Sequence, residues 1–120
     1  MGNPHNELVV KIRLALGREP DLTLWPLVQG VVKNAHTGRQ YRAGLTTGAA
    51  DLVGILTMPC GCGRWFCLEA KTGKGRQTDS QKQFQRLIQH RGGYYGVARS
   101  VEDAQRALSE ARARVESPQH

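Results

Sequence analysis

Gly48-Ala-Ala-Asp51-Leu-Val-Gly-Ile-Leu56 and Trp65-Phe-Cys-Leu-Glu69-Ala-Lys71 are the two stretches that decide the fold. Aliphatic, β-branched and aromatic residues predominate in both, which is typical of strands. The segment between them, residues 57–63, contains proline and glycine and has the composition of a turn. Two strands joined by so short a connection are expected to pair antiparallel.

The register of this strand pair brings three charged residues together. If the loop is centred near Cys60, the numbers of paired residues sum to about 120, and Asp51 lies opposite Glu69. Opposed residues share a face of the sheet, and so do residues two apart along one strand. Asp51, Glu69 and Lys71 should therefore lie on one face, while Ala70 points to the other face and into the core. A slip of one residue would turn Asp51 away from Glu69.

Two carboxylates and an ammonium group are costly to hold together in a core unless something offsets their charge. Mg²⁺ does so, because it prefers carboxylate oxygens and retained waters, often with a substrate phosphate. A lysine beside the ion can hold or deprotonate the attacking water, or neutralise charge that grows on the phosphate. Asp51 followed by Glu69-Ala-Lys71 thus indicates metal-dependent phosphodiester cleavage. The alternative is a solvated strand face with an ordinary Glu69–Lys71 pair.

The chain after Lys71 is strongly basic. It contains seven Lys or Arg residues and one Asp between positions 71 and 99. A basic loop, expected to be mobile, leads to a helix at Thr78, where Thr78 and Gln81 form a capping box. Gln81 either only caps this helix or also reaches the metal's waters or the nucleotide. Because the basic run begins at the predicted metal site, four of its residues are expected to contact DNA phosphates: Lys74, Arg76, Lys82 and Arg86.

The remaining elements complete an α/β pattern. A helix is predicted from His5 to Leu16, capped by Asn3 or Asn6. Glu7 lies near the start of this helix, where the helix dipole stabilises a carboxylate. It has either this capping role alone or a second role in the Asp51 site. A strand within 22–32, interrupted or edged by proline, precedes a turn over 33–38 and a glycine-rich approach to Asp51. A strand over 94–98 and a helix opening at residue 100 follow. This order predicts a mixed sheet flanked by helices, in one domain over 1–120 whose ends, 1–4 and 117–120, are disordered.

Composition limits the possible partners and compartment. The formal net charge is +7 and the pI is about 9.8, which favours a polyanionic partner. No apolar run approaches the length of a membrane span and no signal peptide is evident, so no membrane partner is expected. No small-molecule organic cofactor is expected either. Three cysteines, an odd number, indicate a reduced, cytoplasmic chain. Cys60 and Cys62 are expected in a loop and Cys67 buried, because a structural zinc site would need four ligands.

The order of elements and these residues resemble the PD-(D/E)XK nuclease superfamily and, within it, a stand-alone VRR-NUC domain of phages and bacteria. The resemblance spans roughly residues 7–107 and is strongest at 48–54, at 69–71 and at Gln81. It implies a restriction-endonuclease-like αβββαβ core with an extra C-terminal helix. One departure is Ala50, which stands where the motif has proline. Proline there shapes the backbone and supplies no ligand.

The resemblance also implies an activity, a DNA endonuclease that depends on Mg²⁺ or Mn²⁺. Asp51 and Glu69 would be metal ligands, Lys71 would position or activate water, and Gln81 would support the site. Glu7 matches the family's first-helix glutamate less closely. We expect one or two ions between the two carboxylates and the backbone carbonyl of Ala70, which sits between Glu69 and Lys71, and in-line attack of water on phosphorus.

The substrate is left open by the sequence. Similar single-domain nucleases include Holliday-junction resolvases, which implies a homodimer acting on branched DNA such as four-way junctions or flaps, in a bacterial or phage-infected cytoplasm. One alternative is a nucleic-acid-binding module without turnover. Another is a restriction-type enzyme that reads duplex sequence, although 120 residues leave little room for a dedicated recognition element.

Overall fold

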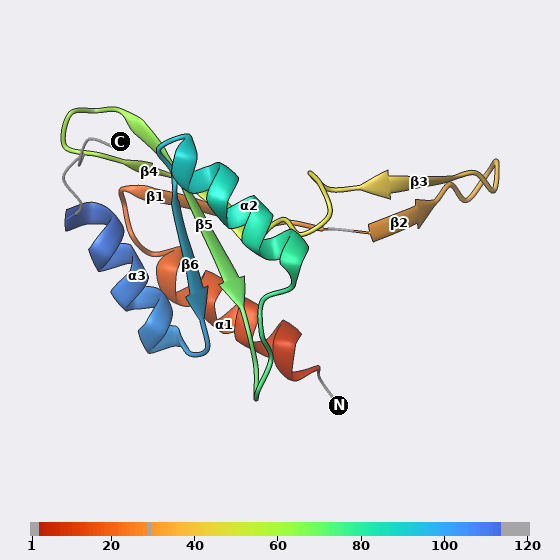
Figure 1. Cartoon of the computed structure of the whole chain (residues 1–120), viewed down its shortest axis with the longest axis horizontal. Helices are drawn as coiled ribbons and strands as arrows, with labels where there is room; N and C mark the ends of the chain where they lie inside the picture. Colours follow the sequence, from red (N-terminus) through yellow and green to blue (C-terminus); the bar gives the residue numbers. More distant parts are fainter. Residues whose placement is uncertain (1–2, 29, 114–120) are drawn as a thin grey trace.

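A computed structural model describes residues 3–28 and 30–113, and the elements are labelled in chain order (Figure 1). They are α1 (Pro4–Leu16), β1 (Leu22–Pro26), β2 (Gly30–Lys33), β3 (Gln40–Ala43), β4 (Leu52–Thr57), β5 (Gly63–Ala70), α2 (Asp79–His90), β6 (Tyr94–Ala98) and α3 (Val101–Ala113). Without β2 and β3, this order is the predicted αβββαβ core followed by one further helix.

The main sheet is mixed, as predicted, with the strand order β1-β4-β5-β6. β4 pairs antiparallel with both β1 and β5, whereas β6 is parallel to β5 after the α2 crossover. Leu52 pairs with Leu68 in the β4–β5 register, so that the next position places Asp51 opposite Glu69. The predicted register is therefore confirmed.

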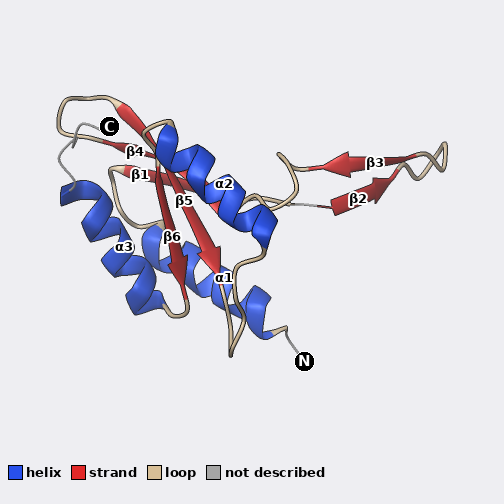
Figure 2. Ribbon diagram, viewed as in Figure 1, coloured by secondary structure: helices blue, strands red, loops and turns tan. Residues whose placement is uncertain are grey.

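Helices cover both faces of this sheet (Figure 2). α1 and α3 pack on one face over a large apolar core that includes Phe66, Leu68 and Ala70. α2 covers the other face, where Val53, Cys67, Phe84 and Tyr95 form a smaller core. Ala70 thus faces the large core, as its alternation with Glu69 and Lys71 predicted.

The helix ends follow local capping chemistry. The Asn3 side chain accepts hydrogen bonds from the backbone N–H groups of His5 and Asn6, and Pro4 is the first residue of α1. Asn3 and Pro4, which belong to the segment 1–4 expected to be disordered, form the cap and the first residue of α1. Residues 1–2 and 117–120 lie outside the described residues. The capping box of Thr78 and Gln81 at the start of α2 is confirmed.

The segment predicted as one interrupted strand over 22–32 forms two strands in different sheets. β1 ends at Pro26, whose ring nitrogen has no hydrogen for a further ladder bond. β2 begins at Gly30, which has a φ of 126° that favours glycine. β2 pairs with β3 in a separate two-stranded sheet. This sheet, with its turn, projects from the body of the molecule (Figure 1), and we call residues 30–43 the arm.

Gly54 allows β1 and β4 to approach closely. A Cβ at this position would lie 2.1 Å from the main-chain oxygen of Thr23. We expect Gly54→Ala to lower the free energy of unfolding in urea by about 3 kcal/mol, because the two strands must separate to admit the methyl group. Thr23→Ala is the matched control, since its side chain is exposed and its main-chain oxygen is unchanged. Equal costs for the two variants would contradict this packing.

Candidate functional site

Glu69 is the buried charge at the centre of the site, with 1% of its surface exposed. The Tyr95 hydroxyl donates a hydrogen bond to its Oε1. The Nζ of Lys71 lies 3.0 Å from its Oε2 as an ion pair. Among the described residues, Oε2 is otherwise buried without a hydrogen-bond partner. A carboxylate oxygen in this state can accept a further ligand.

Burial, together with the adjacent Glu69 carboxylate, raises the pKa of Tyr95 above its ordinary value. The hydroxyl therefore stays protonated and remains a donor to Glu69. Gln77 lies on the other side of this hydroxyl, with its Nε2 3.4 Å from the Tyr95 oxygen. The Tyr95 contact fixes one oxygen of Glu69 and leaves the second oxygen facing Lys71.

Lys71 links the sheet to the head of α2. Its ammonium group donates a hydrogen bond of 2.9 Å to Oε1 of Gln81, which also accepts one of 2.8 Å from the backbone N–H of Thr78. The Gln81 side chain completes the capping box, as predicted, and also holds the ammonium group of Lys71, while a contact with the metal's waters or the nucleotide stays a prediction. Gly48 packs against this helix end, where an added Cβ would lie 2.5 Å from the main chain of Ser80.

Asp51 lies beside Glu69 at the end of the β4–β5 pair. Its Oδ2 accepts a hydrogen bond of 2.7 Å from the backbone N–H of Ala70, and it lies 3.3 Å from Nε2 of His5. Both contacts involve the same oxygen, so Oδ1 makes no hydrogen bond within residues 3–28 and 30–113. Its side chain is 28% exposed, which leaves Asp51 open to a ligand from solvent.

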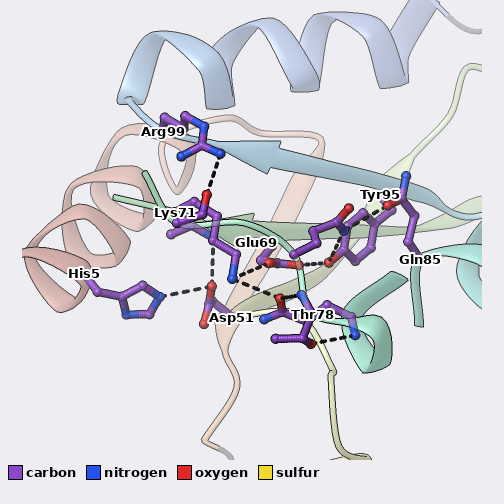
Figure 3. A network of polar contacts seen from close by, with 12 residues as sticks. His5, Asp51, Glu69, Lys71, Thr78, Gln85, Tyr95 and Arg99 are labelled. Atoms are coloured by element: carbon purple, nitrogen blue, oxygen red, sulfur yellow. Dashed lines mark hydrogen bonds and ion pairs between the residues drawn. The ribbon is translucent and has the colours of Figure 1, made fainter. Parts of the chain in front are cut away.

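His5, and not Glu7, is the α1 residue that contacts Asp51. The first turn of α1 does point at Asp51, but its His5 side chain makes the contact (Figure 3). Residues two apart on a helix are separated by roughly 200° around its axis, and the Glu7 side chain is exposed. The structure therefore does not bring Glu7 to the carboxylates. The sequence of α1 did not identify His5, because the Asn3 cap sets where the helix begins and not how it is rotated against the sheet.

The Ala70 carbonyl points toward the Asp51 side of β5. The N–H of Lys71 donates to the carbonyl of Ala98 on β6, on one edge of the strand. Adjacent residues of a strand direct their backbone groups to opposite edges, and the Ala70 N–H indeed donates toward Asp51. The Ala70 carbonyl shares that edge with its N–H, and its contact with a metal ion stays a prediction.

The donor set at this edge fits a hard cation. Glu69 Oε2, Asp51 Oδ1 and the Ala70 carbonyl are oxygens, which Mg²⁺ and Mn²⁺ prefer to nitrogen or sulfur. Among the described residues, no three His, Cys, Asp or Glu side chains gather as a metal-binding group. Such an ion would therefore depend on two carboxylates, a carbonyl and water or phosphate, which is a common arrangement for Mg²⁺.

Basic side chains extend from this site. Arg99, at the end of β6, donates to the carbonyls of Gly73 and Gly75 and so holds the loop after Lys71, for which mobility was expected (Figure 3). Arg76, Lys82 and Arg99 line a hollow of about 480 Å³. The side chains predicted to contact DNA phosphates are all exposed: Lys74, Arg76, Lys82 and Arg86. Arg99 was not identified from the sequence, because its role depends on the loop it contacts.

The cysteines lie apart from this chemistry. Cys60 and Cys62 are exposed in the β4–β5 loop and Cys67 is buried, as predicted, and all three are free. Burial raises the pKa of the Cys67 thiol to about 12. Cys67 therefore acts as a small apolar side chain in the core beneath α2.

The fold and the site together define an α/β sandwich with paired carboxylates and a lysine at the end of a central strand pair. Neither a family model nor a curated protein matches the sequence. Among solved structures, a VRR_NUC domain protein is similar to this chain, with a TM-score of 0.56 and 15% sequence identity, over 92% of this chain and 89% of that one. The chain therefore has the VRR-NUC, restriction-endonuclease-like fold that the resemblance implied. None of the described helices is long and apolar enough to span a membrane.

Tyr95→Phe tests the polar support of Glu69. We expect this variant to lower the free energy of unfolding by about 1–3 kcal/mol, since a buried carboxylate oxygen loses its donor. Tyr94→Phe is the matched control, because the same change on the same strand removes a hydrogen bond of 2.7 Å to Glu110, whose side chain is exposed. Urea unfolding at neutral pH measures both. A cost no larger than that of Tyr94→Phe would argue against a supporting role.

The raised pKa of Tyr95 predicts a dependence of stability on pH. Above the ordinary tyrosine pKa of 10.0, the unfolded chain loses this proton while the folded chain keeps it. The contribution of Tyr95 to stability is therefore present below that pH and is lost as the pH rises. Urea midpoints measured between pH 8 and pH 11 should fall less steeply for Tyr95→Phe than for the unmodified chain, whereas parallel curves would contradict the shift.

Proposed function

We propose that this chain is an endonuclease that hydrolyses phosphodiester bonds in DNA, with Mg²⁺ or Mn²⁺ as its cofactor. The observation that carries the proposal is the buried Glu69 carboxylate, whose Oε2 has an ammonium group beside it but no hydrogen bond. Its alignment with Asp51 across the strand pair supports the proposal. So does the likeness in fold to a protein described as a VRR_NUC domain protein.

In this proposal, Asp51, Glu69 and the Ala70 carbonyl would hold the ion. When bound, the ion would supply a Lewis acid for the phosphate and lower the pKa of a bound water. Lys71 places its positive charge beside Glu69, where it can position the attacking water or stabilise charge that grows on phosphorus. Gln81 is a positioning residue, because its carbonyl oxygen holds the ammonium group of Lys71.

The DNA would lie along the basic loop and the first turns of α2. Exposed Lys74, Arg76, Lys82 and Arg86 are proposed to contact phosphates on either side of the scissile bond. Branched DNA, such as a four-way junction or a flap, is the proposed substrate. Symmetric cleavage of a junction requires two sites, so we propose that the chain acts as a homodimer. Its free thiols suit a reducing cytoplasm.

Asp51→Asn tests the metal ligand while preserving local structure, because the asparagine oxygen can still accept the Ala70 N–H. We expect at least about 100-fold slower cleavage and a Mn²⁺ affinity reduced at least about tenfold by electron paramagnetic resonance. DNA binding should persist, since the change removes negative charge. Undiminished cleavage by the purified variant would exclude Asp51 from the site.

Glu7→Gln is the matched control for the same measurements. This substitution also removes one carboxylate charge, but the Glu7 side chain is exposed and is not joined to Asp51. Mn²⁺ affinity and cleavage rate should stay within about twofold of the unmodified chain. A loss comparable to that of Asp51→Asn would restore Glu7 as a ligand.

A substrate panel separates the candidate functions. Linear duplex, single strand, flap and four-way junction are incubated in parallel with Mg²⁺ or Mn²⁺, with and without EDTA. Cleavage abolished by EDTA and fastest on the junction or flap supports the proposal. Binding without product in any condition would instead indicate a nucleic-acid-binding module.

A further inference from the structure

The arm is an exposed structure with little support of its own. It consists of two short strands, β2 and β3, which pair with each other and not with the main sheet (Figure 1). An isolated two-stranded hairpin is at best marginally stable in water. Two of its large apolar side chains are nonetheless open to solvent, with Val31 64% and Tyr41 56% exposed. A hairpin of this kind gains stability when a partner covers it.

The positive charge of the arm indicates a negatively charged partner. The sequence has no Asp or Glu between Asp21 and Asp51, whereas the arm contributes Lys33, Arg39 and Arg42. In the β2–β3 register, Val31 lies opposite Arg42, and Lys33 lies opposite Gln40. Opposed residues and those two apart share a face, so Lys33 and Arg42 stand together on one side of the ribbon. This side is cationic and polar, with a single apolar residue.

The arm is attached at the candidate active site. The N–H of Leu27, just before the arm, donates a hydrogen bond of 2.9 Å to the Asp51 carbonyl. Gly48, just after it, packs against Ser80 at the head of α2. Both connections to the body of the protein therefore meet at the edge that holds the carboxylates and the basic loop.

We propose that the arm binds duplex DNA beside the cleavage site, with Lys33, Arg39 and Arg42 on phosphates. This inference rests on the proposed nuclease function and adds a second contact surface to it. A two-stranded ribbon fits the major groove, which is about 12 Å wide, and the exposed Val31, on the same side as Lys33 and Arg42, can pack against bases there. A second copy of the chain is a poorer occupant, because the three arm cations would face a remainder that still carries +4 of the chain's +7.

The test neutralises the arm in the Asp51→Asn variant, in which cleavage is expected to be slow. Lys33→Gln, Arg39→Gln and Arg42→Gln are combined with Asp51→Asn, and binding to a labelled duplex is followed by fluorescence anisotropy from 50 to 300 mM salt. Each phosphate contact adds about 0.9 to the slope of log Kd against log salt. We expect the slope to fall by about 2 to 3 and the affinity at 0.1 M salt to fall at least about tenfold.

A matched control removes equal charge elsewhere. Lys11→Gln, Arg13→Gln and Arg18→Gln neutralise three exposed cations on and just after α1. This control should change the salt slope by less than about one unit. Arg39→Lys with Arg42→Lys keeps the charge and should retain the slope. Circular dichroism melting curves verify that each variant is folded. Equal losses for the arm and control triple variants would overturn the inference.

Two further measurements identify the occupant of the arm. Light scattering gives the oligomeric state, and conversion of a dimer to a monomer by the arm substitutions, with DNA affinity unchanged, would show that a second copy covers the arm. Binding to single-stranded DNA should be weakened less than binding to duplex, and an equal loss for both would overturn the groove contact. Cleavage is also measured for the unmodified chain and for the arm variant with Asp51 restored. This measurement separates the nuclease function from DNA binding by the arm. Absence of cleavage in the unmodified chain would contradict the nuclease function and leave the binding result standing.

Discussion

The antiparallel register of β4 and β5 is the constraint on which the rest of the structure depends. Leu52 pairs with Leu68, and one residue further the Asp51 side chain accepts the Ala70 N–H and closes the end of the strand pair. Because side chains alternate along a strand, a slip of one residue would turn Glu69 into the apolar core beneath α1 and α3. The same register therefore determines both the larger core and the alignment of the two carboxylates.

Holding Glu69 in the interior requires compensation from three elements of the fold. Tyr95 from β6 donates to one oxygen, Lys71 at the end of β5 neutralises the charge, and Gln81 from α2 holds Lys71 in place. This arrangement contributes little to net stability, since the desolvation of a buried ion pair tends to cancel its attraction. The cluster is costly and still leaves Oε2 without a hydrogen bond, and the metal ion proposed for this site would supply that oxygen with a partner.

The features that could be predicted from the sequence depend on residues that lie close together in the chain. The β4–β5 register follows from a short loop and residue alternation, and the Thr78–Gln81 capping box from spacing on one helix turn. What could not be predicted depends on the packing of separate elements. The choice of His5 over Glu7 at Asp51 depends on the rotation of α1 against the sheet, which the sequence of α1 leaves open. Pro26 indicated that a strand was interrupted, but not that the chain would leave the sheet there.

The arm is inserted between β1 and β4 without altering the αβββαβ order, because both of its ends return to the same edge of the sheet. That edge also receives the basic loop held by Arg99. At the other end of β1, Glu19 and Asp21 are paired with Arg112 from α3, which lowers the pKa of the Asp21 carboxyl. Acidic groups there are neutralised by a neighbour, whereas the arm carries cations alone. In the proposed function, the cations of the arm and of the basic loop would attract DNA toward the edge that bears Asp51 and Glu69, and salt would weaken this attraction by screening it.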